Sequence, residues 1–223
     1  MKIGIGITTY NRPSLLDNCK KFIQENTCSD FELYVATDTD ENRRGVAKVK
    51  NECLYHLQHC DFIFLFDDDC YPIKKGWEQF VINAHLQTNN HHFVYNREPF
   101  CQIKNYVFHK EYTLESFDGS GGTFMFFTKE VINKIGGFYT GYDLYGFEHI
   151  GYSMRIKKAQ LTEDWFLSIK GLNEYIYSMD YEQDGFFLNE SSINYELKNT
   201  LTQKNMQICN SKDTTQYQPI LFN

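Results

Sequence analysis

The chain has 223 residues, and 22 Lys and Arg against 29 Asp and Glu give it a formal net charge of −7. Hydrophobic residues make up 42% and aromatic residues 17%, a composition too apolar for an intrinsically disordered protein. The acidic balance argues against a nucleic-acid scaffold, which normally carries a basic face, so we expect no stable nucleic-acid partner. The length predicts one domain, or one domain with a small appendage.

The first residues and the cysteines bear on where the protein works. Residues 2–8 alternate Ile with small residues and lack the order of a signal peptide. No apolar run approaches the length of a membrane span, although peripheral membrane contact stays open. The seven cysteines form no C-x-x-C pair, which favours reduced thiols and a cytoplasmic location. His56, His59 and Cys60 are more typical of a helix end than of a metal cluster.

The first 75 residues predict the α/β fold class. Apolar strands are expected at 2–8, 31–37 and 61–66, with amphipathic helices at 13–26 and 45–59 between them. This order of elements predicts a central, mostly parallel sheet flanked by helices.

The pattern changes after residue 69, where shorter elements and aromatic-rich strands predict a smaller antiparallel sheet. We expect helices at 77–87, 129–135 and 147–158 and strands at 92–96, 106–109 and 123–127. Residues 1–171 are predicted to form one domain with halves 1–75 and 76–171. Residues 172–223 are predicted to be a C-terminal extension or lid packed on the same domain.

Polar side chains follow each of the first three strands, at Thr8–Asn11, Thr37–Asp38 and Asp67–Asp69. The carboxyl ends of such strands form the ligand crevice of open α/β sheets. Three successive carboxylates after a buried strand repel one another unless a positive charge lies among them. Mg²⁺ or Mn²⁺ shared with substrate phosphates meets that need. A solvated acidic loop is the simpler alternative.

Four segments resemble GT-A fold glycosyltransferases of the family 2 type, in the family's order and over residues 2–160. Residues 4–13 are similar to the family's strand followed by T-x-Y-N-R, and 45–51 to its G-x-x-x-A-R-N helix. Residues 67–69 lie where the family has its D-x-D motif. Residues 136–138 and 146–155 are similar to the G-G-F and G-G-E-[DN]-x-x-x-x-x-R segments of galactosyl- and N-acetylgalactosaminyltransferases. The resemblance implies a GT-A, Rossmann-like fold.

The resemblance also implies roles for the matched residues. Tyr10 would flank the nucleotide base, and Asp38 would accept a hydrogen bond from the base or ribose. Lys48 or Lys50 would approach the nucleotide or its phosphates, with Arg44 as a competitor. Asp67 and Asp69 would meet the ribose and a Mn²⁺ or Mg²⁺ ion on the diphosphate. The complete implied set for the donor nucleotide is Thr8, Thr9, Tyr10, Arg12, Asp38, Lys48, Lys50, Asp67 and Asp68, with Asp67 and Asp69 at the metal.

A sugar transfer needs a base for the acceptor hydroxyl, and Glu148 is the first candidate. It stands at the start of a predicted helix, where the helix dipole favours an ionised carboxylate; a simple helix N-terminal acid is the alternative. Many family members have an Asp after this Glu, and there the Asp is the usual base. This chain has His149 instead, so the base is Glu148 or His149. A base in this place favours inversion at the sugar carbon.

We therefore expect a metal-dependent glycosyltransferase of the hexosyltransferase type, using a nucleotide-sugar donor, with UDP-sugar favoured. The acceptor would be a hydroxyl of a glycan or glycoconjugate. A sugar-phosphate nucleotidyltransferase is one alternative, but that class carries a glycine-rich loop after its first strand. A catalytically degenerate GT-A module that binds carbohydrate or nucleic acid is another. The intact acids at 67–69 oppose it and His149 keeps it open. The glycine-rich loop 119–122 would approach the sugar or diphosphate, or be a plain turn.

Overall fold

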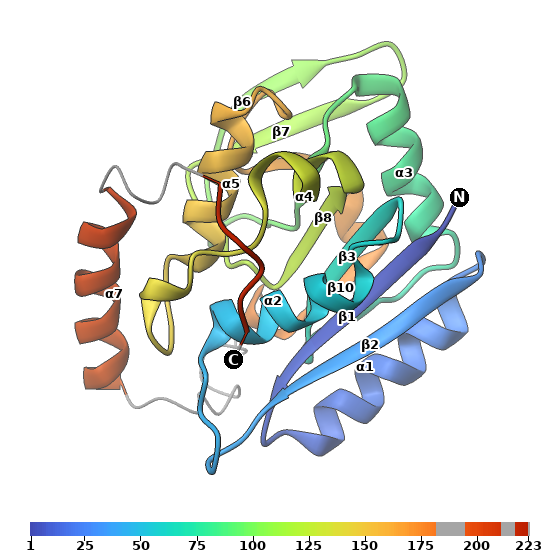
Figure 1. Cartoon of the computed structure of the whole chain (residues 1–223). Helices are drawn as coiled ribbons and strands as arrows, with labels where there is room; N and C mark the ends of the chain where they lie inside the picture. The colour runs from blue at the N-terminus through green and yellow to red at the C-terminus, as the bar shows by residue number, and fades with distance from the viewer. Residues whose placement is uncertain (182–194, 211–216, 223) are drawn as a thin grey trace.

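The computed structural model describes residues 1–181, 195–210 and 217–222 (Figure 1). The strands are β1 (Ile3–Tyr10), β2 (Phe31–Asp38), β3 (Phe62–Asp67), β4 (Cys70–Pro72), β5 (His92–Val94), β6 (Ile103–Phe108), β7 (Thr113–Phe117), β8 (Phe124–Thr128), β9 (Leu167–Ile169) and β10 (Ile176–Ser178). The α-helices are α1 (Pro13–Asn26), α2 (Val46–Leu57), α3 (Trp77–Thr88), α4 (Lys129–Ile135), α5 (Glu148–Lys158) and α7 (Tyr195–Cys209). Short 3-10 helices are η1 (Thr140–Tyr142), η2 (Leu172–Glu174) and η3 (Met179–Tyr181).

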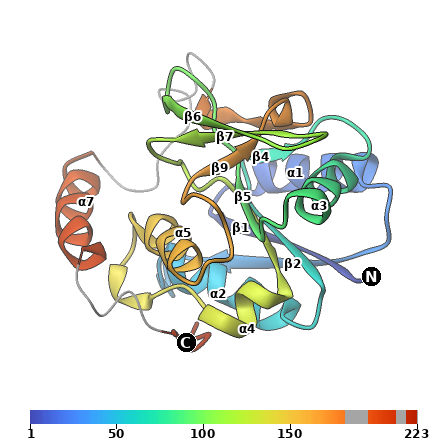
Figure 2. The ribbon, with the colours of Figure 1, turned by 90° about the horizontal axis from the view of Figure 1, so that it is seen from above.

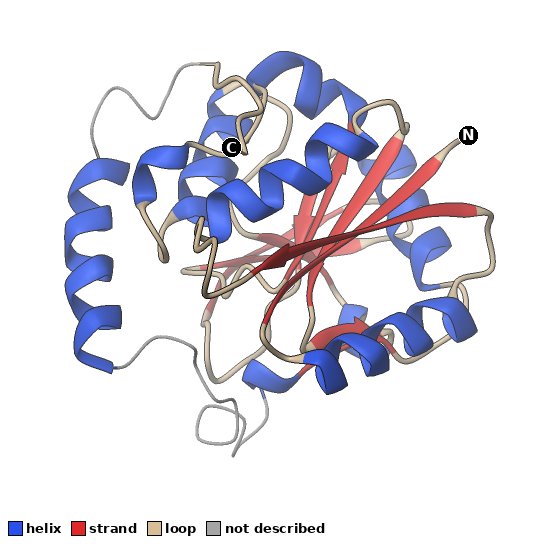
Figure 3. Cartoon of the chain, turned by 60° about the horizontal axis from the view of Figure 1, so that its bottom comes forward, coloured by secondary structure: helices blue, strands red, loops and turns tan. Residues whose placement is uncertain are grey.

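The central sheet has the strand order β2-β1-β3-β8-β5. Figure 3 shows its strands in red, with helices around them. β1 pairs in parallel with both β2 and β3, whereas β8 runs antiparallel to both β3 and β5. The other four strands therefore share one direction, which confirms the expected mostly parallel sheet.

Helices cover both faces of this sheet, α1 and α3 on one and α2, α4 and α5 on the other (Figure 2). Successive side chains of a strand point to opposite faces, so β3 must be apolar at every buried position. The alternation of Ile and Gly in β1 has a packing reason. A Cβ on Gly6 would lie 2.6 Å from Leu65 Cδ2 and 2.8 Å from Cys53 Cβ, so glycine lets α2 pack closely on the sheet.

Two smaller antiparallel sheets lie beyond the central one, β6-β7-β9 and β4-β10. They confirm the expectation of an antiparallel part, but β4, β7, β9 and β10 are strands that we did not predict. The predicted strands 92–96 and 106–109 are β5 and β6, which occupy 92–94 and 103–108. The pairing of β10 with β4 brings residues 176–181 beside the acidic residues that follow β3, and Met179 N–H donates to Asp69 O (3.1 Å).

The last part of the chain adds a helix to the outside of the fold. Helix α7 packs against α5 and η1 (Figure 1). Its buried Asn205 donates from Nδ2 to the carbonyls of Tyr142 (2.6 Å) and Tyr145 (2.7 Å). The remaining parts of the predicted extension, 182–194, 211–216 and 223, lie outside the described residues. Among the helices that the structure describes, none combines the length and apolarity needed to cross a membrane.

Candidate active site

Three parallel strands end side by side at one edge of the central sheet. In the register of β1 with its neighbours, Thr8 stands opposite Asp67 of β3, and Tyr10 stands opposite Asp38 of β2. Open α/β sheets bind their ligands outside the carboxyl ends of their strands. The polar strand ends that the sequence predicts to converge therefore lie together at that edge.

Asp67, Asp68 and Asp69 are called the acid run below; Asp67 ends β3, and Asp68 and Asp69 follow it at this edge. The hydroxyl of Thr8 donates to Asp67 Oδ1 (2.7 Å), and the hydroxyl of Thr9 donates to Asp68 Oδ2 (2.5 Å). These two threonines, which the resemblance assigns to the nucleotide, thus position the carboxylates of the acid run.

Arg12, which immediately precedes α1, forms ion pairs with two members of the acid run. Its Nη1 lies 2.9 Å from Asp69 Oδ2, its Nε donates to Asp68 Oδ2 (3.3 Å), and its Nη2 donates to Asp68 Oδ1. The Asp68 side chain is fully buried, whereas a quarter of the Arg12 side chain is exposed. A guanidinium that bonds two carboxylates replaces part of the positive charge that the sequence led us to expect from a metal alone.

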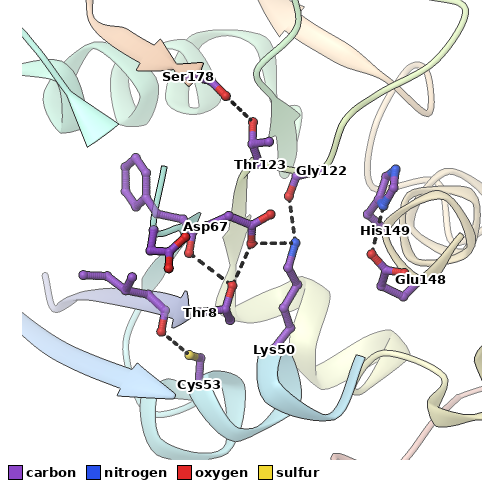
Figure 4. Close-up of polar contacts among 12 residues, drawn as sticks. Thr8, Lys50, Cys53, Asp67, Gly122, Thr123, Glu148, His149 and Ser178 are labelled. Atoms are coloured by element: carbon purple, nitrogen blue, oxygen red, sulfur yellow. Dashed lines mark hydrogen bonds and ion pairs between the residues drawn. The ribbon is translucent and has the colours of Figure 1, made fainter. Parts of the chain in front are cut away.

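Lys50 of α2 is the second cation at the acid run. Its buried ammonium lies 3.3 Å from Asp67 Oδ1 and donates to Gly122 O (2.7 Å), as Figure 4 shows. Lys48 lies two residues earlier on the same helix. It is half-buried and forms no ion pair within the described residues. Of the two lysines that the sequence could not separate, only Lys50 reaches the acid run.

The electrostatics of the acid run favour binding a cation. Burial raises the pKa of Asp68 to about 7, although Arg12 and the hydroxyl of Thr9 both act to lower it. Burial also raises the pKa of Asp67, Lys50 lowers it, and neighbouring Asp69 raises it further. A raised pKa means that the ionised carboxylates are incompletely compensated, so a further positive charge would stabilise them.

The donor atoms of the acid run suit a hard divalent ion. They are all carboxylate oxygens, which Mg²⁺ and Mn²⁺ prefer over softer ligands. Asp68 is enclosed by Thr9 and Arg12, but about a quarter of the Asp67 side chain is exposed. Asp67 is therefore the accessible candidate to hold the ion, and Asp69, the other D-x-D position, is the second candidate, although its side chain is 4% exposed.

Asp38 is buried and bonds the backbone that leads into α2. Its Oδ1 accepts from Arg44 N–H (2.8 Å) and its Oδ2 from Gly45 N–H (3.1 Å). Both carboxylate oxygens thus hold the turn before the helix that carries Lys50. A contact of Asp38 with the nucleotide stays a prediction.

Tyr10 lies at the rim of the same edge, between a carboxylate and a guanidinium. Its hydroxyl donates to Asp40, and the guanidinium carbon of Arg43 lies 3.3 Å from the centre of its ring. Such cation–π contacts hold an aromatic face in place. Arg43 could not be predicted as part of this edge, because nothing in the sequence distinguishes it from the adjacent Arg44.

Glu148 is the first residue of α5, and its carboxylate is almost completely buried. Its Oε1 lies 3.1 Å from His149 Nδ1, and its Oε2 has no hydrogen-bond partner among the described residues. Burial would raise its pKa, but the hydrogen bond and charge of His149, with the charge of Lys50, lower it to about 2. Glu148 is therefore ionised at neutral pH, on the opposite side of Lys50 from Asp67 (Figure 4).

His149 links Glu148 to the glycine-rich loop 119–122. Its Nε2 lies 2.7 Å from Ser120 O while its Nδ1 faces Glu148. A carbonyl and a carboxylate only accept hydrogen bonds, so the His149 ring can only donate in these contacts. Gly122 has φ +73°, and a Cβ there would lie 2.6 Å from the His149 ring. The loop that the sequence left undecided thus packs on His149 and accepts from Lys50.

Two other residues of the family-like segments support the fold. Asn51 accepts from Phe138 N–H (2.7 Å) and donates to Phe138 O (3.0 Å). The buried guanidinium of Arg155 donates to the carbonyls of Ile135 (2.8 Å) and Gly137 (2.5 Å). Both tie the Gly136–Phe138 turn to neighbouring helices, away from the acid run.

A separate group of metal-type donors lies at the other end of the strands. Glu32, His59 and Cys60 each bring one ligand atom within 4.8 Å of the others. His59 Nε2 already lies 2.8 Å from Glu32 Oε2, and both side chains are about half exposed. His56, which the sequence places beside them, instead stacks on Tyr34 with ring centres 3.9 Å apart.

Comparison with known proteins supports the fold. No protein-family profile matches the chain. A viral protein, an uncharacterized glycosyltransferase of Acanthamoeba polyphaga mimivirus, is 27% identical over 198 residues, covering 74% of this chain and 77% of the relative.

Several solved structures superpose on most of the chain. Residues 1–349 of TarS of S. aureus, in complex with UDP, have a TM-score of 0.59 at 13% identity, over 92% of this chain and 71% of that TarS fragment. The mannosyltransferase PcManGT of Pyrobaculum calidifontis, with GDP-Man and Mn²⁺, has 0.52 at 12% identity, over 90% and 68%. A Drosophila β-1,4-galactosyltransferase 7 with manganese, UDP-Gal and xylobiose has 0.52 at 14% identity, over 90% and 79%. The chain has the GT-A glycosyltransferase fold.

Proposed function

We propose that the protein is a metal-dependent glycosyltransferase that moves a sugar from a nucleotide-diphosphate donor to a hydroxyl of a glycan or glycoconjugate. The observation that carries the proposal is the arrangement at the sheet edge. The acid run and the ionised carboxylate of Glu148 lie on either side of the buried Lys50 ammonium. The similar structures bind UDP, GDP-Man or UDP-Gal. Two of these three ligands contain uridine, which favours a UDP-sugar.

On this proposal the two halves of the domain have different tasks. Residues 1–75 bind the nucleotide through Thr8, Tyr10 and the acid run, residues 76–171 bind the acceptor, and 172–223 extend the same domain. Asp67 and Asp69 would hold Mn²⁺ or Mg²⁺, which when bound neutralises charge on the departing diphosphate. Lys50 holds Asp67 in place and adds a fixed positive charge.

Glu148 would take the proton of the acceptor hydroxyl while that oxygen attacks the sugar carbon. The bond from this carbon to the diphosphate oxygen breaks, and the bonding pair leaves with the diphosphate. A pKa of about 2 makes Glu148 a weak base in the resting protein. The hydroxyl becomes more acidic as its oxygen bonds the electron-poor sugar carbon. Proton transfer to Glu148 therefore becomes favourable late in the step. A single displacement of this kind inverts the configuration.

A donor panel tests the proposal. The release of nucleoside diphosphate from UDP-, GDP- and dTDP-sugars would be measured with Mn²⁺ or Mg²⁺, using the Asp69→Ala variant as the control. We expect release from at least one donor, dependent on the metal and lost in the variant. Neither release nor metal-dependent binding for any donor would contradict the proposal and favour a non-catalytic module.

A further inference from the structure

Arg12 and Lys50 both neutralise the acid run, but they differ in how firmly they are held. Lys50 is 1% exposed and also donates to Gly122 O, so its ammonium is fixed from two sides. The Arg12 side chain is 25% exposed while the carboxylates that it pairs with are 0% and 4% exposed. Its guanidinium therefore covers Asp68 and Asp69 from the solvent side.

The position of Arg12 conflicts with a metal ion at Asp69. Arg12 Nη1 donates a hydrogen bond to Asp69 Oδ2 (2.9 Å). A divalent ion bound by Asp69 would use the same oxygen. An ion at Asp69 would also stand beside a like-charged guanidinium, which is unfavourable in a partly buried site. The metal and Arg12 therefore compete for Oδ2 of Asp69.

A diphosphate offers the guanidinium another partner. Arg binds phosphate oxygens with two parallel hydrogen bonds, as it binds a carboxylate. A quarter of the Arg12 side chain is exposed, so a diphosphate at the sheet edge can contact its guanidinium. We propose that Arg12 is an internal counter-ion that blocks Asp69 in the free protein and is released by a nucleoside diphosphate, so that metal and nucleotide bind together. This rests on the proposed function, and it makes Arg12 a positioning residue.

The test uses a charge-balanced variant. Arg12→Ala alone would leave Asp68 buried without a cation, which destabilises a fold. The double variant Arg12→Ala/Asp68→Asn removes one positive and one negative charge, so the net charge of the cluster is unchanged. Asp68→Asn alone is the matched control, because it keeps Arg12 beside Asp69. Thermal melting of wild type, the double variant and the control checks that all three proteins fold.

Mn²⁺ binding is then titrated by the electron paramagnetic resonance signal of the free ion, first with Mn²⁺ alone. We expect the double variant to bind Mn²⁺ at least tenfold more tightly than wild type, and the control to show no such gain. Added UDP or GDP should tighten Mn²⁺ binding more in wild type than in the double variant, because only wild type must release Arg12. A gain shared by the control would assign the effect to loss of the Asp68 carboxylate instead of removal of Arg12, and would overturn the inference.

Equal Mn²⁺ affinity of wild type and the double variant, without nucleotide, would also overturn the inference while leaving the proposed function intact. A different result identifies failure of the proposed function. If neither UDP nor GDP binds any of the three proteins in the presence of Mn²⁺, the proposed donor site is wrong and the release step with it. The two failures are therefore distinguishable. If nucleotide binds but removal of Arg12 leaves Mn²⁺ affinity unchanged, only the inference fails; if no nucleotide binds, the proposed function fails.

Discussion

Arg155 and Arg12 both lie in family-like segments, yet their guanidinium groups have different kinds of partner. Arg155 is 3% exposed and donates to two backbone carbonyls at the end of α4. Arg12 is more exposed and pairs with two carboxylates of the acid run. A cation bonded to the backbone is fixed by the fold, whereas a cation bonded to other charges can exchange its partner for a charged ligand.

Glu78 and Glu148 repeat the contrast among the acids, since both lie in the first turn of a helix and both are buried. Glu78 Oε1 accepts from the backbone N–H groups of Cys28 and Ser29, each at 3.0 Å. Glu148 instead bonds the side chain of His149. In both residues Oε2 lacks a hydrogen-bond partner among the described residues. A carboxylate oxygen without a partner is therefore not by itself evidence of a functional site. The type of partner and the place at the sheet edge separate them.

The largest effect should come from removing a carboxylate of the acid run. Asp69→Asn keeps the size of the side chain but weakens its hold on a divalent ion. Because the ion stabilises the leaving diphosphate by several kcal/mol, we expect donor turnover to fall about 10³-fold with little change in melting temperature. A variant that keeps more than a tenth of wild-type turnover would remove Asp69 from the metal site.

Glu148→Gln should come next. It removes the base but keeps the shape of the side chain, so we expect kcat to fall by about 10² or more while the Kd for UDP changes little. Steady-state kinetics and calorimetric UDP binding separate these quantities. His149→Gln, which can still donate to one partner, should lower kcat less; an equal or larger loss would make His149 the base.

Arg155→Ala tests the other side of the comparison. It leaves the carbonyls of Ile135 and Gly137 buried without a donor, so we expect the free energy of unfolding to fall by about 3 kcal/mol. UDP affinity of the folded protein should stay at the wild-type value. Denaturant unfolding and UDP titration check this, with Arg155→Lys as a milder control. Normal stability with lost UDP binding would instead place Arg155 in the site.

The two lysines of α2 provide a matched pair. Lys50→Ala removes a charged partner of Asp67 and of Gly122 O, so we expect UDP to bind about ten- to a hundredfold more weakly. Lys48→Ala removes a half-buried charge without an ion pair in the described residues and should change UDP affinity less than about threefold. The reverse ranking would assign the phosphate contact to Lys48.

Lowering the pH should reduce the free energy of unfolding, because Glu148 becomes protonated. Its pKa in the folded protein is about 2, below the ordinary value of 4.5, so it contributes stability above pH 4.5 and loses it as the pH falls toward 2. The loss is about 1.4 kcal/mol per pH unit within this window. The difference in unfolding free energy between wild type and Glu148→Gln should shrink over it. A difference that does not change with pH would mean that the pKa is not lowered.

The sequence predicts the central sheet well because its signals are local. Five successive apolar residues in β3, and Leu15, Leu16, Cys19, Phe22 and Ile23 at helical spacing in α1, each identify a whole element. Strands β4 and β10 have three residues each and form only by pairing with one another. A pairing between residues about a hundred positions apart leaves no periodic pattern, so these strands could not be predicted.

In the candidate site, too, some features could be predicted from the sequence and others could not. The acid run and Glu148 stand out by residue type and by position after a strand or before a helix. The bond from Arg12 to Asp68 spans 56 positions, and the contact of His149 with Ser120 O depends on the path of a glycine loop. Such contacts are set by tertiary packing. For that reason the sequence placed Arg12 and Lys50 among the residues for the nucleotide but did not predict that they pair with the carboxylates of the acid run.

The central claim, that the acid run binds a nucleoside diphosphate through a divalent ion, is tested most directly by calorimetric titration of wild type with UDP and GDP. The titration is run once with Mn²⁺ and once with EDTA. We predict that at least one nucleotide binds with Mn²⁺ and that its affinity falls at least tenfold in EDTA. Binding of equal strength in both solutions, or no binding in either, would contradict the account.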